Sequence, residues 1–444
     1  MAHMHLTTFV MPLGYHRNSW CRPGSRAEEV PGLGFLSDIA RMAEEAKLDA
    51  LFFGDVAHAT STLRGDTMMN GFYEPMTTLA ALAARTERIG LIGTLSTSLY
   101  EPYNVARLLS SLDHLSGGRA GWNIVTSADG YRNFGIEAAP EPEERYRRSE
   151  EFVRVVEELW DSWSDDAVIV DRAERRWLDP ERLRRIDFEG DYFRVEGPLN
   201  MPRSPQGRPV LVQAGSSGPG MRLGSAVANI IYTAQPDLQQ AVEFSARMKA
   251  LAAEQGREPG EVKVIPGIVP VVADSQAEAD EIAAELSSFL DVEQGRLQIA
   301  GDLQADLSDL ELDEPIPAER FASIGTLSSR QGIYRRKSVE QGLSLRELIY
   351  DRARSTGHQW VAGTAETVAD RMQQWFEAGA CDGFNLNSPY NPDGFERICT
   401  KLVPELQNRG LFRSEYTGVT LRDHLGLPRP ANRFGGAADA ERAR

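Results

Sequence analysis

The feature that most constrains the fold is an alternation of short apolar runs with longer amphipathic segments along nearly the whole chain. Eight apolar runs have the length and composition of buried strands, at residues 6–13, 49–55, 89–95, 119–125, 210–214, 229–233, 262–273 and 383–387. Segments with helical periodicity lie between them, among them 35–46, 75–85, 104–115 and 144–163. This pattern is typical of a parallel sheet covered by helices. It predicts an α/β fold, a closed (β/α)8 TIM barrel, with an open doubly wound sheet as the alternative.

Two long stretches interrupt this alternation. Residues 164–206 are rich in charged residues and proline, and residues 290–359 are acidic in their first half and basic in their second. We interpret both as insertions, after strands four and seven, in a single barrel domain that spans residues 1–430. Residues 431–444 lack apolar periodicity and are predicted to form a disordered tail.

The second insertion leaves the predicted barrel on the side where active sites of this fold lie. It is therefore predicted to cover the site, since long loops in this position often act as lids. An oligomer contact or a mobile surface loop is the alternative. A cover would bring basic side chains toward an anionic ligand, and the candidates are Arg330, Arg335, Arg336 and Lys337.

Composition excludes several classes of function. The formal net charge of −17 disfavours nucleic acid as a partner, because phosphate binding needs a basic surface. No apolar run approaches the roughly 20 residues that span a bilayer, so no membrane association is expected. The three cysteines include no C-x-x-C pair, which favours a cytoplasmic location and disfavours a metal site. A small-molecule ligand is the remaining expectation.

Polar residues stand where several of the predicted strands end. Asp55 follows the second strand, Thr94 lies at the end of the third, and Asn123 lies near the end of the fourth. In a (β/α)8 barrel these positions meet at the carboxyl-terminal face, where active sites form. The alternative for each residue is a helix cap or turn, because short polar side chains also serve there.

A second candidate site follows the fifth predicted strand, in the sequence QAGSSGPG (213–220). Glycines allow close approach of an anion, Ser216 and Ser217 offer hydroxyl donors, and the helix that follows has unpaired N–H groups at its start. Tyr146, flanked by three arginines in the sequence ERYRR, has a phenol suited to phosphate oxygens. The alternatives are a plain strand-to-helix turn and a solvated helix start.

The rest of the sequence contains no Ser/His/Asp set, no carboxylate pair and no metal-ligand spacing. An enzyme with this sequence is therefore expected to rely on a bound cofactor for its chemistry while the protein orients the reactants.

Three segments carry a specific resemblance: EPMTTLAALAARTERIGLIGTLSTSLYEPYNVARLLSSLDHLSGGRAGWNIVTS, RSPQGRPVLVQAGSSGPG, and CDGFNLN with the later LVPELQNRGLFRSEYTGVTLRDHLGLPRP. In these segments the chain resembles the nitrilotriacetate monooxygenase and dibenzothiophene sulfone monooxygenase group of the bacterial luciferase-like flavin enzymes. The likeness runs in the same order from about residue 9 to residue 430.

The resemblance implies a barrel of the bacterial luciferase type that uses reduced FMN and O2 to oxygenate a small organic substrate. The reduced FMN would come from a separate NAD(P)H:flavin reductase, and the chain would form a homodimer or homotetramer. Matched position by position, Asp55, Thr94 and Asn123 are implied to face the flavin ring, while the phosphate is implied to contact Tyr146, Ser216 and Ser217.

Two further residues, His16 and Trp20, match positions near the substrate pocket of the group, although His16 is equally well explained as a packing residue. The chain departs from the group at Ile136 to Pro142, where relatives commonly carry histidines. It also has Leu13 and Ala128 where the alkane enzyme has a cysteine and a histidine. These departures leave the nature of the substrate open.

Possible substrates include xenobiotics, aminopolycarboxylates, sulfur heterocycles, halogenated aromatics and flavin itself. Two other functions also stay open: a deazaflavin-dependent oxidoreductase and a non-catalytic flavin-binding protein.

Overall fold

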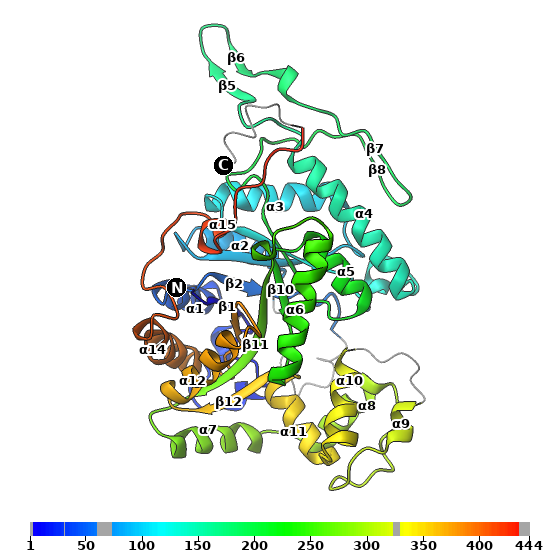
Figure 1. The fold of residues 1–444 in the computed structure, drawn as a ribbon, viewed down its shortest axis with the longest axis vertical. Coiled ribbons are helices and arrows are strands. Elements are labelled where there is room, and N and C mark those ends of the chain that lie inside the picture. Colours follow the sequence, from blue (N-terminus) through cyan, green and yellow to red (C-terminus); the bar gives the residue numbers. More distant parts are fainter. Residues whose placement is uncertain (1–2, 31, 60–72, 323–328, 435–444) are drawn as a thin grey trace.

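The computed structural model describes residues 3–30, 32–59, 73–322 and 329–434. Parallel strands form a closed barrel at its centre, and helices surround it (Figure 1). Closure comes from the pairing of β10 with β11 and of β13 with β1. The TIM barrel predicted from the sequence is thus confirmed. Its eight strands are β1 (His5–Phe9), β2 (Ala50–Phe53), β3 (Gly90–Ser96), β4 (Ala120–Val125), β9 (Val210–Gln213), β10 (Ile230–Thr233), β11 (Lys263–Val272) and β13 (Gly383–Leu386).

The sheet contains one further parallel strand, β12 (Gln359–Gly363), which the sequence analysis did not predict. β11 is long enough to pair along its first half with β10 and along its second half with β12. The second insertion therefore does not return to the barrel as a loop. It ends in a strand that extends the sheet beyond the barrel rim.

The barrel interior is filled by side chains from alternate strand positions, as the pleat of a strand requires. Apolar residues of α15 (Leu421–His424) and the segment after it close the amino-terminal end of the barrel. The carboxyl-terminal end carries the polar side chains described below. The interior cluster consists of Ala50, Phe52, Ile92, Val210, Val212, Ile230, Ile265, Leu421, Leu425 and Leu427.

The outer helices bury their apolar faces against the outward-facing strand residues, and most of this layer belongs to the largest core cluster. The helical segments predicted from periodicity all lie in this layer. Its main helices are α1 (Leu33–Glu45), α2 (Pro75–Ala83), α3 (Pro102–Ser116), α4 (Pro142–Trp160), α5 (Gly218–Val227), α6 (Leu238–Glu254), α7 (Gln276–Ser288), α12 (Ala365–Glu377) and α14 (Val403–Asn408). Smaller clusters lie under α5, α6 and α7.

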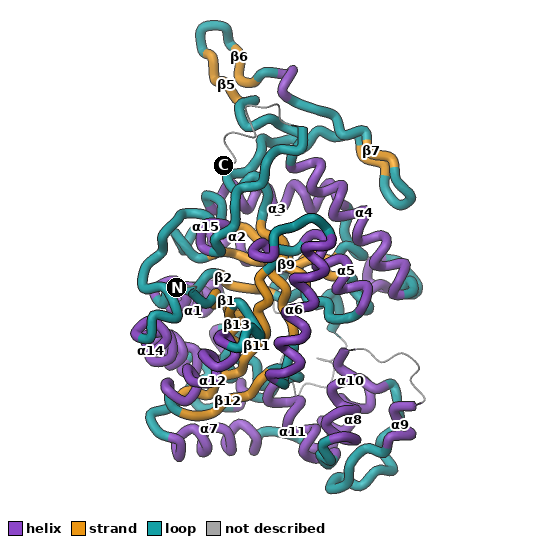
Figure 2. Tube along the Cα trace, viewed as in Figure 1, coloured by secondary structure: helices purple, strands orange, loops and turns teal. Residues whose placement is uncertain are grey.

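The first insertion follows α4 and consists mainly of loop with two short antiparallel pairs, which project from one end of the molecule (Figures 1 and 2). The pairs are β5 (Val168–Asp171) with β6 (Arg176–Leu178), and β7 (Phe188–Glu189) with β8 (Arg194–Val195).

The second insertion is mostly helical, comprising α8 (Val292–Leu303), α9 (Ala318–Ala322), α10 (Ser329–Arg335), a π-helical turn (Arg336–Glu340) and α11 (Leu345–Ser355). It has its own apolar cluster, which includes Ile299, Leu303 and Phe321. An insertion that buries its own core is a packed unit and not a solvated loop.

Three of the basic residues that were predicted to reach an anionic ligand form ion pairs or hydrogen bonds within this insertion or with the neighbouring helix α6. Arg335 lies 3.0 Å from Glu340, and Lys337 lies 2.6 Å from Asp351. Arg336 donates a hydrogen bond to Gln240 on α6. The side chain of Arg330 is outside the described residues. The described cations therefore contact protein partners, and the covering role of the insertion stays a prediction.

The sequence predicts a disordered tail from residue 431, but Asn432 and Arg433 contact the rest of the chain. Asn432 is buried and donates from Nδ2 to the carbonyl oxygen of Trp163 at 2.7 Å. The backbone N–H of Arg433 donates to Asp161 at 3.1 Å. Residues 431–434 are therefore packed against the chain that follows α4, through contacts that a local sequence pattern does not reveal. Residues 435–444 lie outside the described residues.

Within the described ranges, no helix is long and apolar enough to cross a membrane. The same residues contain no group of three or more His, Cys, Asp or Glu side chains arranged to hold a metal ion. The three cysteines are not joined in disulfides.

Candidate active site

Two polar residues inside the barrel form one side of the candidate site. Thr94 and Asn123 are paired across β3 and β4. Thr94 donates to the Phe53 carbonyl oxygen at 2.8 Å, and the Asn123 amide nitrogen donates to the Thr94 hydroxyl at 2.9 Å. The amide oxygen of Asn123 is buried and has no hydrogen-bond partner among the described residues. Because buried polar atoms are almost always paired, this oxygen is fitted to accept a hydrogen bond from a bound molecule.

Asp55 follows β2 and is half-buried at the rim of the same barrel end. Burial, and secondarily the nearby Glu74 carboxylate, raise the pKa of the Asp55 carboxyl above its ordinary value. Ser96, at the end of β3, accepts a hydrogen bond from Ser127 at 2.8 Å. The predicted convergence of strand-end polar residues on one barrel face is thus present, although the contact of Asp55 with a ligand stays a prediction.

The predicted phosphate loop lies between β9 and α5. Ser217 caps α5 and accepts a hydrogen bond from the Gly220 N–H at 3.3 Å. The Ser216 hydroxyl lies 3.1 Å from that of Thr233 on the neighbouring strand β10.

Tyr146, on α4, reaches this loop, and a Cβ added to Gly220 would lie 3.0 Å from its phenol oxygen. Glycine at 220 therefore allows the phenol, the two serine hydroxyls and the start of α5 to come together. Such an arrangement favours an anion. The cap interpretation of Ser217 is correct, because its hydroxyl accepts a hydrogen bond from the first turn of α5.

The arginines beside Tyr146 do not all face this loop. Arg148 donates to the Thr97 carbonyl oxygen, and its guanidinium lies 4.7 Å from the centre of the Phe193 ring. Arg147 pairs with Glu144 on the surface of the same helix. Arg148 therefore links α4 to the chain after β3 and to the first insertion, whereas the Arg147 pair lies within α4. The Tyr146 phenol does reach the loop.

An aromatic group that the sequence analysis missed forms the other side of the barrel mouth. Tyr232 stacks between Phe9 and His358, with ring centres 6.1 and 5.3 Å away. Tyr15 lies edge-on to the His358 ring at 5.7 Å. Tyr232 lies near the end of β10. The reasoning that selected Asn123, that polar residues at strand ends meet at one face of the barrel, would therefore also have selected Tyr232. His358, just before β12, gave no comparable local signal.

His16 is fully buried, and neither of its ring nitrogens has a hydrogen-bond partner in the described structure. Burial, followed by the charge of Arg354, lowers the pKa of His16 to about 4. The imidazole is therefore neutral at physiological pH. Trp20 lies in a short turn, Ser19–Cys21, and is 37% exposed. The packing interpretation of His16 fits its burial, and a substrate role for either residue stays a prediction.

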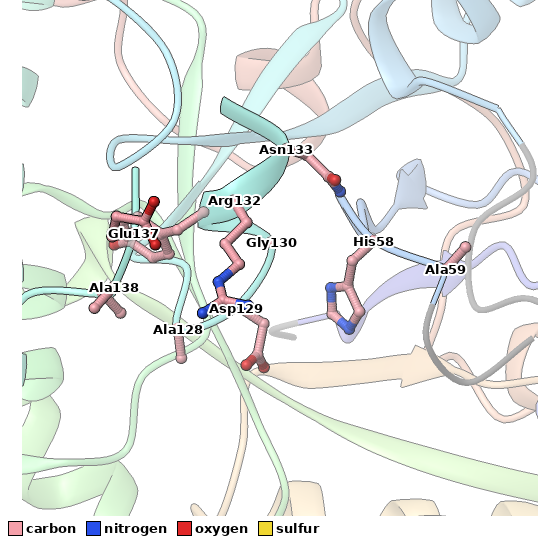
Figure 3. Close-up of a pocket in the computed structure, with 11 residues that line it drawn as sticks. His58, Ala59, Ala128, Asp129, Gly130, Arg132, Asn133, Glu137 and Ala138 are labelled. Carbon is pink, nitrogen blue, oxygen red and sulfur yellow. The ribbon is translucent and has the colours of Figure 1, made fainter. Parts of the chain in front are cut away.

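A cavity of about 570 Å³ lies between the loops that follow β2 and β4. Figure 3 shows His58 on one side of this space and Asp129 and Arg132 on the other. The departure from the resembled group at residues 136–142 borders the same cavity through Glu137 and Ala138. A histidine therefore lines it from the β2 loop and not from the segment after β4.

A family model described as luciferase-like monooxygenase matches residues 11–382, most of the chain. The chain belongs to this family. It is 41% identical over 433 residues to N-acetyl-S-(2-succino)cysteine monooxygenase of Bacillus subtilis (strain 168), covering 97% of this chain and 98% of that protein. It is 39% identical to nitrilotriacetate monooxygenase component A of Aminobacter aminovorans, covering 94% and 95% of the two chains. These relatives confirm the resemblance stated from the sequence.

The fold of this luciferase-like family member also matches a solved structure of riboflavin lyase with modified FMN and the substrate riboflavin. The TM-score is 0.85 at 30% identity, and the match covers 96% of each chain. The barrel described above is therefore the luciferase-like type.

Proposed function

We propose that the protein is the oxygenase of a two-component system. It takes reduced FMN from a separate NAD(P)H:flavin reductase and uses O2 to place one oxygen atom in a small organic substrate. One observation carries this proposal. The loop between β9 and α5, which suits a phosphate, lies at the same end of the barrel as the Asn123 amide oxygen, which has no hydrogen-bond partner among the described residues. When bound, reduced flavin supplies the electrons that activate oxygen, and the protein binds, orients and shields the reactants.

The residues present fit this cofactor. Ser216, Ser217 and Tyr146 surround the start of α5, where N–H groups and the helix dipole favour a phosphate. The Asn123 amide oxygen is an acceptor for a ring N–H. Asp55 at the rim completes the set implied by the resemblance.

The name of one relative, component A, supports a second component that supplies reduced flavin. For the substrate we propose a polar compound containing sulfur or nitrogen, since two relatives are named for a substituted cysteine and for nitrilotriacetate. The cavity beside His58 and Arg132 offers hydrogen-bond donors for it. A cytoplasmic location accords with the free cysteines.

Anaerobic titration tests the cofactor assignment. Reduced FMN is expected to bind more tightly than oxidised FMN, because the protein must collect the reduced form from a reductase and release the oxidised form afterwards. The purified protein should then be nearly colourless. Stoichiometric yellow FMN that survives extensive dialysis would contradict the two-component assignment.

Replacing Ser217 with alanine is expected to weaken the binding of reduced FMN by roughly 10- to 100-fold, because a hydrogen bond to a charged phosphate contributes about 1.5–3 kcal/mol. Reduced riboflavin, which lacks the phosphate, should bind equally well to both proteins. Ser275→Ala removes the same kind of helix cap from α7 and serves as the matched control. Equal losses for FMN and riboflavin would place the phosphate elsewhere.

We also propose a homodimer or homotetramer, by analogy with the luciferase-like barrels that the sequence resembles. Light scattering at micromolar concentration should give a mass of at least twice the 49.2 kDa of one chain. A monomeric mass would exclude this assembly.

A further inference from the structure

His358, at the end of the second insertion, packs against a glycine of the barrel wall, Gly267. A Cβ placed on Gly267 of β11 would lie 2.4 Å from His358 Nδ1 and 2.8 Å from Asn387 Nδ2. No side chain larger than hydrogen fits at 267 unless these groups move. Glycine at this position therefore admits the imidazole, which the chain delivers directly after α11.

Once inside, His358 holds a tyrosine. Its Nε2 lies 2.9 Å from the Tyr232 hydroxyl, and the two rings are nearly parallel. The Asn387 amide nitrogen donates to the same hydroxyl at 3.4 Å. The Tyr232 hydroxyl is therefore held by the chain that follows β13 and by the end of the insertion.

The chain of contacts continues across the barrel. The Asn385 amide nitrogen donates to the Asn387 amide oxygen at 3.1 Å, and the Thr7 hydroxyl donates to the Asn385 amide oxygen at 2.6 Å. These groups are uncharged amides and a hydroxyl. Burial, and then the Tyr15 phenol, raise the pKa of Tyr232 well above its ordinary value, so the phenol stays protonated.

The two members of the pair differ in exposure. His358 is buried, whereas Tyr232 and Tyr15 are each half-buried at the mouth. Tyr232 is followed by Thr233, whose hydroxyl contacts Ser216 of the phosphate loop. If the phosphate of a flavin bound at that loop, the ring system would reach the adjacent barrel mouth, where Tyr232 lies one residue from the Ser216 contact.

We propose that the phenols of Tyr232 and Tyr15 contact the ring system of bound reduced flavin, and that His358 is a positioning residue that orients Tyr232. Through His358, the second insertion is tied to the cofactor. This inference rests on the proposed function, because it takes reduced flavin as the ligand.

Binding of reduced flavin under anaerobic conditions tests the contact. Tyr232→Phe should weaken the binding of reduced FMN and of reduced riboflavin by the same factor. The expected factor is about three- to tenfold, the loss of one neutral hydrogen bond. This differs from Ser217→Ala, which should affect FMN alone. His358→Gln should show a similar loss, and the double variant should lose no more than either single one, since contacting residues that act as a unit are not additive.

Nuclear magnetic resonance of ¹⁵N-histidine in the flavin-free protein provides a readout that does not need the ligand. Tyr232→Phe should shift the resonance that His358→Gln removes and leave the other histidine signals in place. Gly267→Ala should shift that same resonance, because the added methyl group displaces the ring. It serves as a second variant in case His358→Gln fails to fold.

The outcomes separate this inference from the proposed function. Wild-type protein that binds no reduced flavin would refute both. Wild-type binding with no loss in Tyr232→Phe would overturn the ring contact alone. Additive losses in the double variant, or an unmoved His358 resonance in Tyr232→Phe, would overturn the positioning role of His358.

Discussion

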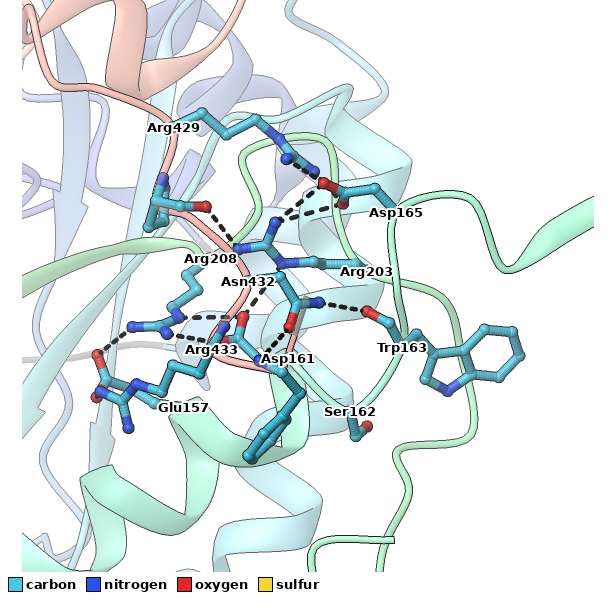
Figure 4. Close-up of polar contacts among 12 residues, drawn as sticks. Glu157, Asp161, Ser162, Trp163, Asp165, Arg203, Arg208, Arg429, Asn432 and Arg433 are labelled. Atoms are coloured by element: carbon cyan, nitrogen blue, oxygen red, sulfur yellow. Dashed lines mark hydrogen bonds and ion pairs between the residues drawn. The ribbon is translucent and has the colours of Figure 1, made fainter. Parts of the chain in front are cut away.

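Replacing Asp161 with alanine is expected to lower the free energy of unfolding by about 3–5 kcal/mol, the cost of breaking buried ion pairs by removing the carboxylate that two arginines share. Asp161 is fully buried and lies between two guanidinium groups (Figure 4). Its carboxylate is 3.1 Å from Arg203, whose side chain is 1% exposed, and it also pairs with Arg208. The backbone N–H of Arg433 donates to it as well.

This cluster joins the end of α4, the end of the first insertion and the carboxyl-terminal segment. The last of these carries the apolar residues that close the barrel at its amino-terminal end. Loss of Asp161 should therefore loosen that closure as well as the insertion. Urea unfolding followed by far-ultraviolet circular dichroism measures the change.

Glu196→Ala is the matched control. Glu196 pairs with Arg185 at 2.7 Å in the same insertion, but both side chains are about two-thirds exposed. A pair of this kind contributes about 0–1 kcal/mol. If Asp161→Ala cost no more than Glu196→Ala, the cluster would not be what holds the carboxyl-terminal segment.

Acidification from pH 6.5 to pH 4 is expected to destabilise the protein through two buried histidines. The folded-state pKa values of His16 and His424 are both lowered from 6.5 to about 4, mainly by burial. In this range the unfolded chain binds protons that the folded chain excludes, so stability falls as the pH falls. A shift of this size contributes up to about 3 kcal/mol for each histidine.

The pH dependence of the urea midpoint measures this effect. His16→Gln and His424→Gln should each remove about half of the histidine-dependent slope, and the double variant should remove nearly all of it. Each variant also alters packing, so the slope with pH and not the stability at one pH is the relevant quantity. An unchanged slope in the double variant would show that other groups cause acid sensitivity.

The barrel could be predicted from the sequence because its strands are short and apolar and are separated by amphipathic helices. This pattern is local, so it can be recognised without knowledge of tertiary contacts. The same locality explains why the sequence places Thr94 and Asn123 on the same barrel face, since a strand end fixes the face on which a side chain lies. β12 was missed because it is short and only partly buried, and it follows a long insertion.

The remaining differences depend on contacts between distant parts of the chain. His358 joins Tyr232 from 126 positions away, through space that Gly267 leaves open. Residues 431–434 are held in place by Asp161 and Trp163, which lie about 270 positions earlier in the sequence. Periodicity and motif spacing carry no information about such pairings, so these features required the structure.

The most direct test of the proposed function is oxygen-isotope incorporation. The protein is incubated with FMN, NAD(P)H, a generic flavin reductase, ¹⁸O2 and a panel of small sulfur- and nitrogen-containing compounds, and products are examined by mass spectrometry. One ¹⁸O atom in a product that forms only when this protein is present would support an FMN-dependent monooxygenase. Recovery of all the consumed oxygen as hydrogen peroxide with every compound, together with tight binding of reduced FMN, would contradict it and favour a non-catalytic flavin-binding protein.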